Sequence, residues 1–239
     1  MNSTSKPKTD DIPEKTSIDF SFVLASSVHD MKNSLGMLLN TLSAMMVNSP
    51  PKDAEQAHFF SVLEYEAARI NGELVQLLSL YRMDENTMSV VIDEHHTIDI
   101  IEDQIARNDT LLKSRHIDVQ VECEPDLVWY FDSELISGVL NNLIVNCARY
   151  SRKQLLISAA EENGYLCITI ADDGQGYPDN MLMGSLPQAP VSFSSGNTRL
   201  GLLFTRKVLE LHKSKNRYGY MTIANNGPLG GGELKLYLP

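Results

Sequence analysis

The stretch VHDMKNSLGM at residues 28–37 places a histidine, an acid, a lysine and an asparagine within five positions. His29 and Asn33 are four residues apart, so on a helix their side chains share one face. A free imidazole has a pKa of about 6.5, so at neutral pH much of it carries an unprotonated ring nitrogen that can attack phosphorus. Asp30 would hold the other ring N–H, and Asn33 would orient the ring or a water molecule. Ordinary solvated helix surface is the plain alternative for the same residues.

Two long helices are predicted to position this cluster. Apolar residues recur at alternating three- and four-residue steps, first at Leu24, Val28, Met31, Leu35, Leu38, Leu42 and Met45, then at Phe60, Leu63, Ala67, Ile70, Leu74, Leu77 and Tyr81. Pro50 and Pro51 end the first helix, so the second returns antiparallel to it. His29 and Asn33 fall outside the apolar seam. We therefore expect them on a rigid outer face that another protein can approach.

The chain is expected to have a polar tail, a helical hairpin and a mixed part. Residues 1–17 are polar and contain two prolines, which predicts a disordered tail. The hairpin is expected at 18–84, and two hairpins joined in a four-helix bundle would cover their apolar faces, which predicts a homodimer. From residue 85 to 239 strand-like and amphipathic helical runs alternate, so the fold class is α+β. The strands are predicted at 117–123, 127–131, 154–160, 165–171 and 233–239, and the helices at 98–113, 133–150 and 200–212.

Composition excludes several classes of protein. The 239 residues carry a net charge of −11, which argues against a nucleic-acid-binding surface. No run approaches the roughly 18 apolar residues of a membrane helix, and the N-terminus lacks the apolar core of a signal peptide. Three cysteines without CxxC spacing indicate neither a disulfide framework nor a zinc site. We therefore expect a cytoplasmic chain that inserts into no membrane.

A second cluster, NNLIVNCARYS, lies in the predicted helix at 133–150. Asn142 and Asn146 are four residues apart and share one face. A side-chain carbonyl oxygen is a suitable ligand for Mg²⁺, which accompanies nucleotide phosphates. Arg149 would then meet phosphate oxygens, and Tyr150 would stack on a base. A solvated pair of asparagines is the plain alternative.

Further along, the strand YLCITIA leads into DDGQGYP at residues 172–178. Gly174 and Gly176 allow a tight loop to approach a ligand closely. A carboxylate accepts hydrogen bonds and does not donate them, so Asp172 facing a base would favour the exocyclic amine of adenine over the carbonyl of guanine. The nucleotide selected in this way would be ATP. An acidic glycine turn without a ligand is the alternative.

Two more glycine-rich segments follow. GNTRLGL at 196–202 opens into a helical segment, whose first backbone N–H groups suit phosphate oxygens. NNGPLGGGELKLYLP at 225–239 is a glycine-rich turn that leads into a terminal strand. Each segment alone fits ordinary structure, whereas the four in this order form a specific combination.

This order, after a histidine-bearing hairpin, resembles the core of the bacterial two-component sensor histidine kinases over residues 18–239. HDMKN looks like the family's H box, NNLIVNCARYS is similar to its N box, and DDGQG and GNTRLGL are similar to its two glycine boxes. The resemblance implies an α/β sandwich of the Bergerat type that binds ATP with Mg²⁺. It also implies that His29 is the phosphoacceptor, Asp30 its general base, and Asn33 the residue used in dephosphorylating the partner.

The resemblance further implies the residues of a nucleotide site. Asn146 would coordinate Mg²⁺ with Asn142 in support. Arg149 and Tyr150 would touch phosphate and base, and Asp172 would recognise adenine. The remaining residues implied at the pocket are Gly174, Gly176, Gly196, Arg199 and Gly201.

Two departures from the family pattern leave alternatives open. Arg199 stands where the family usually has glycine, where it contacts the triphosphate or obstructs the loop, and the lid between Gly176 and Gly196 is short. The leading hypothesis is a cytosolic, homodimeric kinase that phosphorylates His29 from Mg·ATP and passes the phosphoryl group to a response-regulator receiver domain. One form of this hypothesis adds dephosphorylation of the same receiver domain. The alternatives are a phosphotransferase or phosphatase with a degenerate ATP-binding domain, and a non-enzymatic docking regulator. Because no sensor segment accompanies the core, we expect a separately encoded sensor protein.

Overall fold

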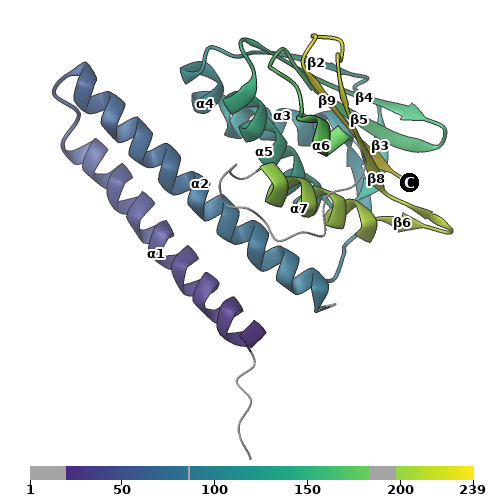
Figure 1. Cartoon of the computed structure of the whole chain (residues 1–239), viewed down its shortest axis with the longest axis horizontal. Coiled ribbons are helices and arrows are strands. Elements are labelled where there is room, and N and C mark those ends of the chain that lie inside the picture. The colour runs from purple at the N-terminus through teal and green to yellow at the C-terminus, as the bar shows by residue number, and fades with distance from the viewer. Residues whose placement is uncertain (1–19, 86, 183–197) are drawn as a thin grey trace, which may run out of the picture.

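The computed structural model describes residues 20–85, 87–182 and 198–239, so the predicted tail at 1–17 lies outside the described residues (Figure 1). Helix α1 (Phe20–Asn48) and helix α2 (Ala54–Asp84) pack side by side as an antiparallel hairpin. Asp53 caps α2, since its Oδ1 accepts a hydrogen bond from the backbone N–H of Gln56 at 2.7 Å. The predicted hairpin is therefore present within one chain.

Only part of the predicted apolar seam is covered within this hairpin. Val28 and Leu42 of α1 and Ala67 of α2 are buried, with at most 8% of each residue exposed. Met31 and Leu38, which continue the same seam, are 55% and 50% exposed. The packing of α1 on α2 thus leaves a second apolar row uncovered in the single chain.

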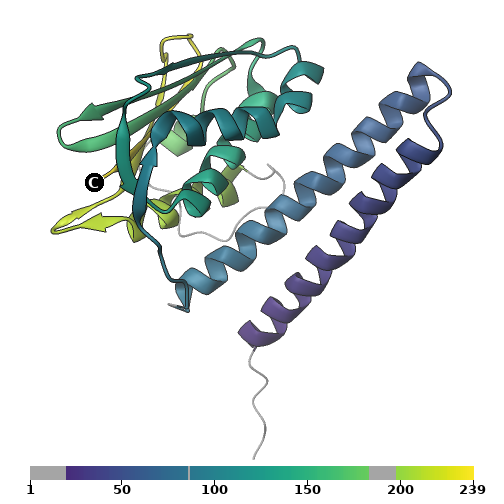
Figure 2. The ribbon, with the colours of Figure 1, turned by 180° about the vertical axis from the view of Figure 1, so that it is seen from behind.

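The rest of the chain is a layer of helices on a five-stranded sheet. The strand order is β2-β4-β5-β9-β8, with β2 parallel to β4 and the other neighbours antiparallel. The strands are β2 (Asp118–Cys123), β4 (Gln154–Glu162), β5 (Tyr165–Asp172), β8 (Tyr220–Asn225) and β9 (Gly232–Leu238). One face of the sheet is covered by α3 (Thr97–Arg107), α5 (Ser133–Tyr150) and α7 (Thr198–Leu211), as Figures 1 and 2 show from opposite sides.

Alternation along the strands builds the core between these layers. Leu155 and Ile157 of β4, and Leu234 and Leu236 of β9, are at most 1% exposed. Their neighbours in β9 point to the other face of the sheet and are half-buried. The alternation in β9 therefore sets which of its residues lie in the core.

Several short elements complete the fold. Strand β1 (Asp93–His96) pairs antiparallel with β3 (Val128–Phe131) in a separate two-stranded sheet. The strand predicted at 127–131 thus forms, but outside the main sheet. The remaining elements are α4 (Asp109–Ser114), α6 (Asp179–Leu182), β6 (Lys213–Ser214) and β7 (Arg217–Tyr218). The sequence analysis predicted neither β1 nor the strands between 213 and 225.

The single helix predicted at 98–113 is wrong, because the structure divides it at Asn108 into α3 and α4. The side-chain Nδ2 of Asn108 donates to the carbonyl of Gln104 at 2.8 Å and to Oδ1 of Asn141 at 2.9 Å. A side chain that bonds its own backbone and a neighbouring helix offers the chain an alternative to continued helix. The amphipathic period continues across this break, so it did not reveal it.

Helix α2 also contacts the α/β part. Met83 is buried in the same core cluster as α5 and the sheet, and Leu80 packs against that cluster. Farther along, α2 lies against α7. Figures 1 and 2 both show α2 between α1 and the α/β part. Within the described residues, no helix combines the length and apolar character needed to cross a bilayer.

Candidate functional site

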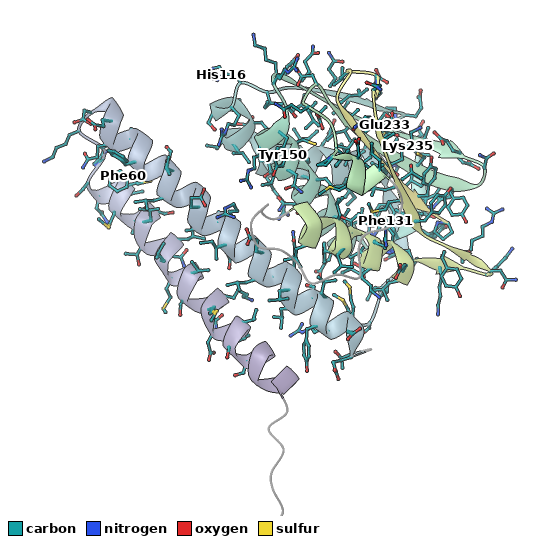
Figure 3. The ribbon with its side chains drawn as sticks, in the orientation of Figure 1. Phe60, His116, Phe131, Tyr150, Glu233 and Lys235 are labelled. Carbon is teal, nitrogen blue, oxygen red and sulfur yellow. The ribbon has the colours of Figure 1, made fainter. Side chains whose placement is uncertain are left out.

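A cavity of about 590 Å³ opens between α5, the loop after β5 and the start of α6, a size typical of small-ligand sites. Five of the predicted site residues line it: Asn146, Arg149, Tyr150, Asp172 and Gly176. Tyr150, labelled in Figure 3, is nearly half exposed at the end of α5. Most of the apolar lining comes from Leu143, Ile170, Met181, Leu202 and Leu234. The cavity therefore combines an apolar floor with a few polar groups.

Helix α5 positions the two asparagines. Asp132 caps the helix, since its Oδ1 accepts from the backbone N–H of Leu135 at 3.0 Å, and the apolar face of the helix is buried against the sheet. Asn142 and Asn146 lie one turn apart, and the Nδ2 of Asn146 is 3.4 Å from the Oδ1 of Asn142. Asn142 does not line the cavity. Because the Nδ2 of Asn146 is directed at Asn142, its Oδ1 is the atom left for the cavity.

That oxygen fits the requirement of a hard cation such as Mg²⁺. Among the residues that the structure describes, no group of three or more His, Cys, Asp or Glu side chains is placed to hold a metal. Nucleotide phosphates would supply further oxygen donors to a cation held next to Asn146. Arg149 also lines the cavity, and its guanidinium is a cationic group that would suit the same phosphates.

Asp172, at the end of β5, is 8% exposed and faces the cavity. Its Oδ1 accepts hydrogen bonds from the backbone N–H groups of Gly174 at 2.7 Å and Gly232 at 3.4 Å. Burial raises the pKa of this carboxyl above its ordinary value, against the lowering effect of those two donors. Both hydrogen bonds use Oδ1, so Oδ2 is the oxygen that a ligand amine would meet.

The next residue, Asp173, ties this loop to the end of α5. Its carboxylate accepts from the backbone N–H groups of Arg152 at 2.8 Å and Lys153 at 3.0 Å. Burial alone would raise the pKa of Asp173, but hydrogen bonds from the backbone amides of Lys153, Gln154 and Arg152 outweigh it, so the pKa lies below its ordinary value. The two adjacent acids therefore have different roles, and the sequence analysis assigned a role only to the first.

Asn225 of β8 fastens the loop that carries Gly176 and Tyr177. Its Oδ1 accepts from the backbone N–H of Tyr177 at 2.7 Å, and its Nδ2 donates to the carbonyl of Tyr177 at 2.8 Å. Gly176 has φ of +76°, and a Cβ there would lie 2.4 Å from the Asn225 Oδ1, so this close approach requires glycine. Asn225 was placed in the turn at 225–239 without a role of its own, because β8 was not predicted.

We expect Asn225→Ala to weaken nucleotide binding without blocking the cavity. Loss of both hydrogen bonds leaves the amide and carbonyl of Tyr177 without their partner, at a cost of about 1–3 kcal/mol of stability. The loop next to Asp172 should then be less ordered, and the affinity for an ATP analogue should fall about tenfold. Calorimetry and urea unfolding measure the two effects. The matched control is Asn216→Ala on the exposed β6–β7 turn, and equal behaviour of both variants would contradict the role of Asn225.

Among the other predicted pocket residues, Gly174 and Gly201 are described by the structure and do not line the cavity. Gly174 donates to Asp172 as described above. In α7, a Cβ on Gly201 would lie 2.5 Å from the Nδ2 of Asn142, so glycine there lets α7 approach α5. Gly196 and the side chain of Arg199 lie outside the described residues, and the backbone of Arg199 is in the first turn of α7. Several lining residues were given no predicted site role, among them Arg152, Gln175, Tyr177 and Met181.

The first cluster is assembled on α1 as predicted from its spacing. The side chain of His29 is 56% exposed, and its Nδ1 lies 3.6 Å from Oδ1 of Asp30. The Nδ2 of Asn33 lies 3.3 Å from the same ring nitrogen. Both neighbours thus meet Nδ1, which leaves Nε2 as the ring atom that an incoming group would meet. Since α2 lies between α1 and the α/β part, the structure assembles this cluster and the cavity separately and does not bring them together.

Comparisons with known proteins agree with this arrangement. Residues 131–239 match the family model described as histidine kinase-, DNA gyrase B-, and HSP90-like ATPase. The chain is 25% identical over 193 residues to the sensor histidine kinase CssS of Bacillus subtilis, covering 80% of this chain and 42% of CssS. It is 29% identical over 164 residues to the sensor histidine kinase HprS of Escherichia coli, covering 67% of this chain and 36% of HprS. The chain thus spans less than half the length of these relatives.

Solved structures show the same fold. The Acinetobacter baumannii histidine kinase AdeS superimposes with a TM-score of 0.60 at 17% identity, covering 86% of this chain and 95% of that one. Full-length ShkA, solved in complex with AMPPNP, gives a TM-score of 0.64 at 15% identity, covering 92% of this chain and 46% of that one. Both similarities extend beyond the α/β part, because each covers more of this chain than residues 85–239.

Proposed function

We propose that this chain, which has the core of a two-component sensor histidine kinase, transfers the γ-phosphoryl group of Mg·ATP to His29. From His29 the group would pass to an aspartate on the receiver domain of a response regulator. The observation that supports this best is the occurrence in one chain of a cavity with Asp172 and Asn146 and an exposed His29 flanked by Asp30 and Asn33. We place the phosphotransfer hairpin at 18–84 and the ATP-binding domain at 85–239.

In this proposal the cavity binds ATP by its two ends. Oδ2 of Asp172 accepts a hydrogen bond from the exocyclic amine of adenine, and the ring of Tyr150 stacks on the base. Arg149 and the Oδ1 of Asn146 face the phosphates, and Mg²⁺ held there neutralises their charge. The open cavity favours this function over a phosphotransferase with a degenerate ATP-binding domain, since a degenerate pocket need not keep these groups together.

Transfer to His29 would proceed by nucleophilic attack. Nε2 forms a bond to the γ-phosphorus as the bond from that phosphorus to the leaving ADP oxygen breaks. In the reactive tautomer Nδ1 carries the proton and keeps it, so the amide of Asn33 would turn its Oδ1 toward Nδ1 in place of Nδ2. The carboxylate of Asp30 nearby stabilises the positive charge that develops. Because α2 separates α1 from the cavity, the ATP-binding domain must leave its position against α2, or the cavity of a partner subunit must serve His29.

We propose that a second copy of the chain covers the exposed apolar row of the hairpin. Met31, Leu38 and Leu63 are each at least half exposed on the hairpin, and a four-helix bundle would bury them. Light scattering should therefore give a dimer at micromolar concentration, and Leu38→Glu with Leu63→Glu should give a monomer. Asn40→Glu, on an exposed position of α1, should stay dimeric. A monomeric unmodified chain would rule out the bundle.

Incubation of the full chain with γ-labelled ATP and Mg²⁺ tests the function. The protein should gain phosphate that is labile in acid and stable in alkali, as expected of a phosphorylated histidine. Addition of receiver domains should then remove label from the chain with a preference for one of them. Absence of label, together with absence of Mg-dependent ATP binding, would favour the phosphotransferase or phosphatase alternative with a degenerate ATP-binding domain instead.

A further inference from the structure

Three side-chain amides connect α2 to the cavity. The Nε2 of Gln76 on α2 donates to the Oδ1 of Asn142 at 2.9 Å, and the Nδ2 of Asn146 lies 3.4 Å from the same oxygen. Gln76 and Asn142 are 66 residues apart in sequence, so this contact joins the hairpin to the ATP-binding part. The sequence analysis did not assign any role to Gln76.

The amide of Asn142 is held tightly in place. Its Nδ2 is buried and has no hydrogen-bond partner among the described residues, while its Oδ1 meets both neighbouring amides. In α7, Gly201 leaves no room beside it, since a Cβ there would lie 2.5–3.0 Å from the Asn142 amide atoms. The packing of Leu80 and Met83 into the core keeps α2 at this position. The amide orientation of Asn142 therefore depends on Gln76 and in turn fixes the amide orientation of Asn146.

We propose that Gln76 is a positioning residue that acts through Asn142 to turn the side-chain oxygen of Asn146 toward Mg·nucleotide. Contact between α2 and the ATP-binding domain would then strengthen Mg-dependent nucleotide binding, and Mg·nucleotide would strengthen that contact equally, because such coupling is reciprocal. This inference rests on the function proposed above, in which Asn146 meets the metal. In this way the hairpin helps to orient a residue of the nucleotide site.

The direction of the hydrogen bonds gives the inference its physical content. With a donor at residue 76, Asn142 presents Oδ1, Asn146 presents Nδ2 to it, and the Oδ1 of Asn146 faces the cavity. With an acceptor at residue 76, Asn142 must turn its Nδ2 toward that residue. Asn146 must then turn its Oδ1 toward the Nδ2 of Asn142. Its Nδ2 would then face the cavity, and an amide NH₂ cannot coordinate a cation.

Two isolated substitutions in the full chain separate these arrangements. Gln76→Glu keeps the size of the side chain and replaces the donor by an acceptor, whereas Gln76→Lys keeps a donor. Calorimetry with a non-hydrolysable ATP analogue, in Mg²⁺ and in excess EDTA, measures the gain in affinity due to the metal. We expect Gln76→Glu to reduce this gain about tenfold, the lower end of the effect of outer-shell partners on metal affinity, and Gln76→Lys to retain it. Simple charge effects predict the opposite order, since a carboxylate attracts the cation and an ammonium repels it.

The outcomes distinguish this inference from the function on which it rests. In EDTA the Gln76 variants and the unmodified chain should bind equally, because the base contacts are unchanged. Gln120→Glu, at an exposed position of β2, is the matched control and should behave like the unmodified chain. If the unmodified chain shows no Mg-dependent binding, the proposed function fails. If it does and Gln76→Glu keeps the full metal gain while folded by circular dichroism, the positioning role of Gln76 is refuted.

Discussion

Replacement of His29 by glutamine is expected to abolish the acid-labile phosphate that the chain gains from γ-labelled Mg·ATP. Glutamine keeps a polar side chain of similar length on an exposed helix face, so the hairpin should fold as before. It has no ring nitrogen with a lone pair that attacks phosphorus at neutral pH. Loss of a covalent acceptor is an all-or-none effect, so label should fall to background. Gel autoradiography after alkaline transfer measures it.

The control for this experiment is another exposed histidine. His96 lies in the α/β part at the start of α3, and His96→Gln should label at the rate of the unmodified chain. Binding of an ATP analogue should be the same in both variants, since neither residue lines the cavity. Acid-labile label that persists in the His29 variant would show that another residue is the acceptor, and the proposed role of α1 would then be wrong.

The sequence predicted the elements that depend on local pattern. The helix expected at 133–150 has the same bounds in the structure, because a capping Asp132 precedes a continuous amphipathic run. The spacing of Asn142 and Asn146 placed them on one face, and the glycines after β5 marked the loop beside Asp172. These residues meet in one region because α5 packs on the sheet that contains β5. The order of the motifs indicated this fold through its resemblance to a family.

The features that sequence did not reveal are contacts between distant segments. The break at Asn108 depends on Asn141, and the loop at Tyr177 is fastened by Asn225. Gln76 meets Asn142 only because α2 packs along α7. An amide side chain carries no periodic signal, since glutamine and asparagine also occur widely on solvated helix surfaces. Only the positions of neighbouring backbones show which of these amides have partners.

The position of α1 relative to the cavity could not be predicted from the motifs. The histidine cluster and the cavity each assemble from their own segments, yet α2 lies between their supporting elements. The order of the motifs in the sequence indicates which residues a phosphotransfer site would contain, but it does not give the distance between them. The structure therefore adds a requirement to the proposed function, which is that phosphorylation of His29 would need a rearrangement or a second subunit.

Replacement of Asp172 by asparagine is expected to weaken binding of an ATP analogue by about 10- to 100-fold, the effect of losing a hydrogen bond to a charged group. The backbone donors of Gly174 and Gly232 both meet Oδ1, so the asparagine oxygen should keep that place. The new NH₂ group would then replace Oδ2 and oppose the exocyclic amine of adenine, donor against donor. The same NH₂ group suits the carbonyl of guanine, so the ratio of GTP to ATP affinity should rise. Calorimetry with both analogues measures it.

The pH dependence of binding provides a second readout for the same variant. Burial raises the pKa of Asp172, so its carboxylate gains a proton at a less acidic pH than an ordinary aspartate, and the protonated form is a poorer acceptor. Affinity for ATP should therefore fall as the pH is lowered toward that pKa, and asparagine at this position should remove this part of the dependence. Asp118→Asn, at an exposed position of β2, should change neither the affinity nor its pH profile. An Asp172→Asn chain that binds ATP as tightly as the unmodified one would remove Asp172 from base recognition, and with it the physical reason for preferring adenine.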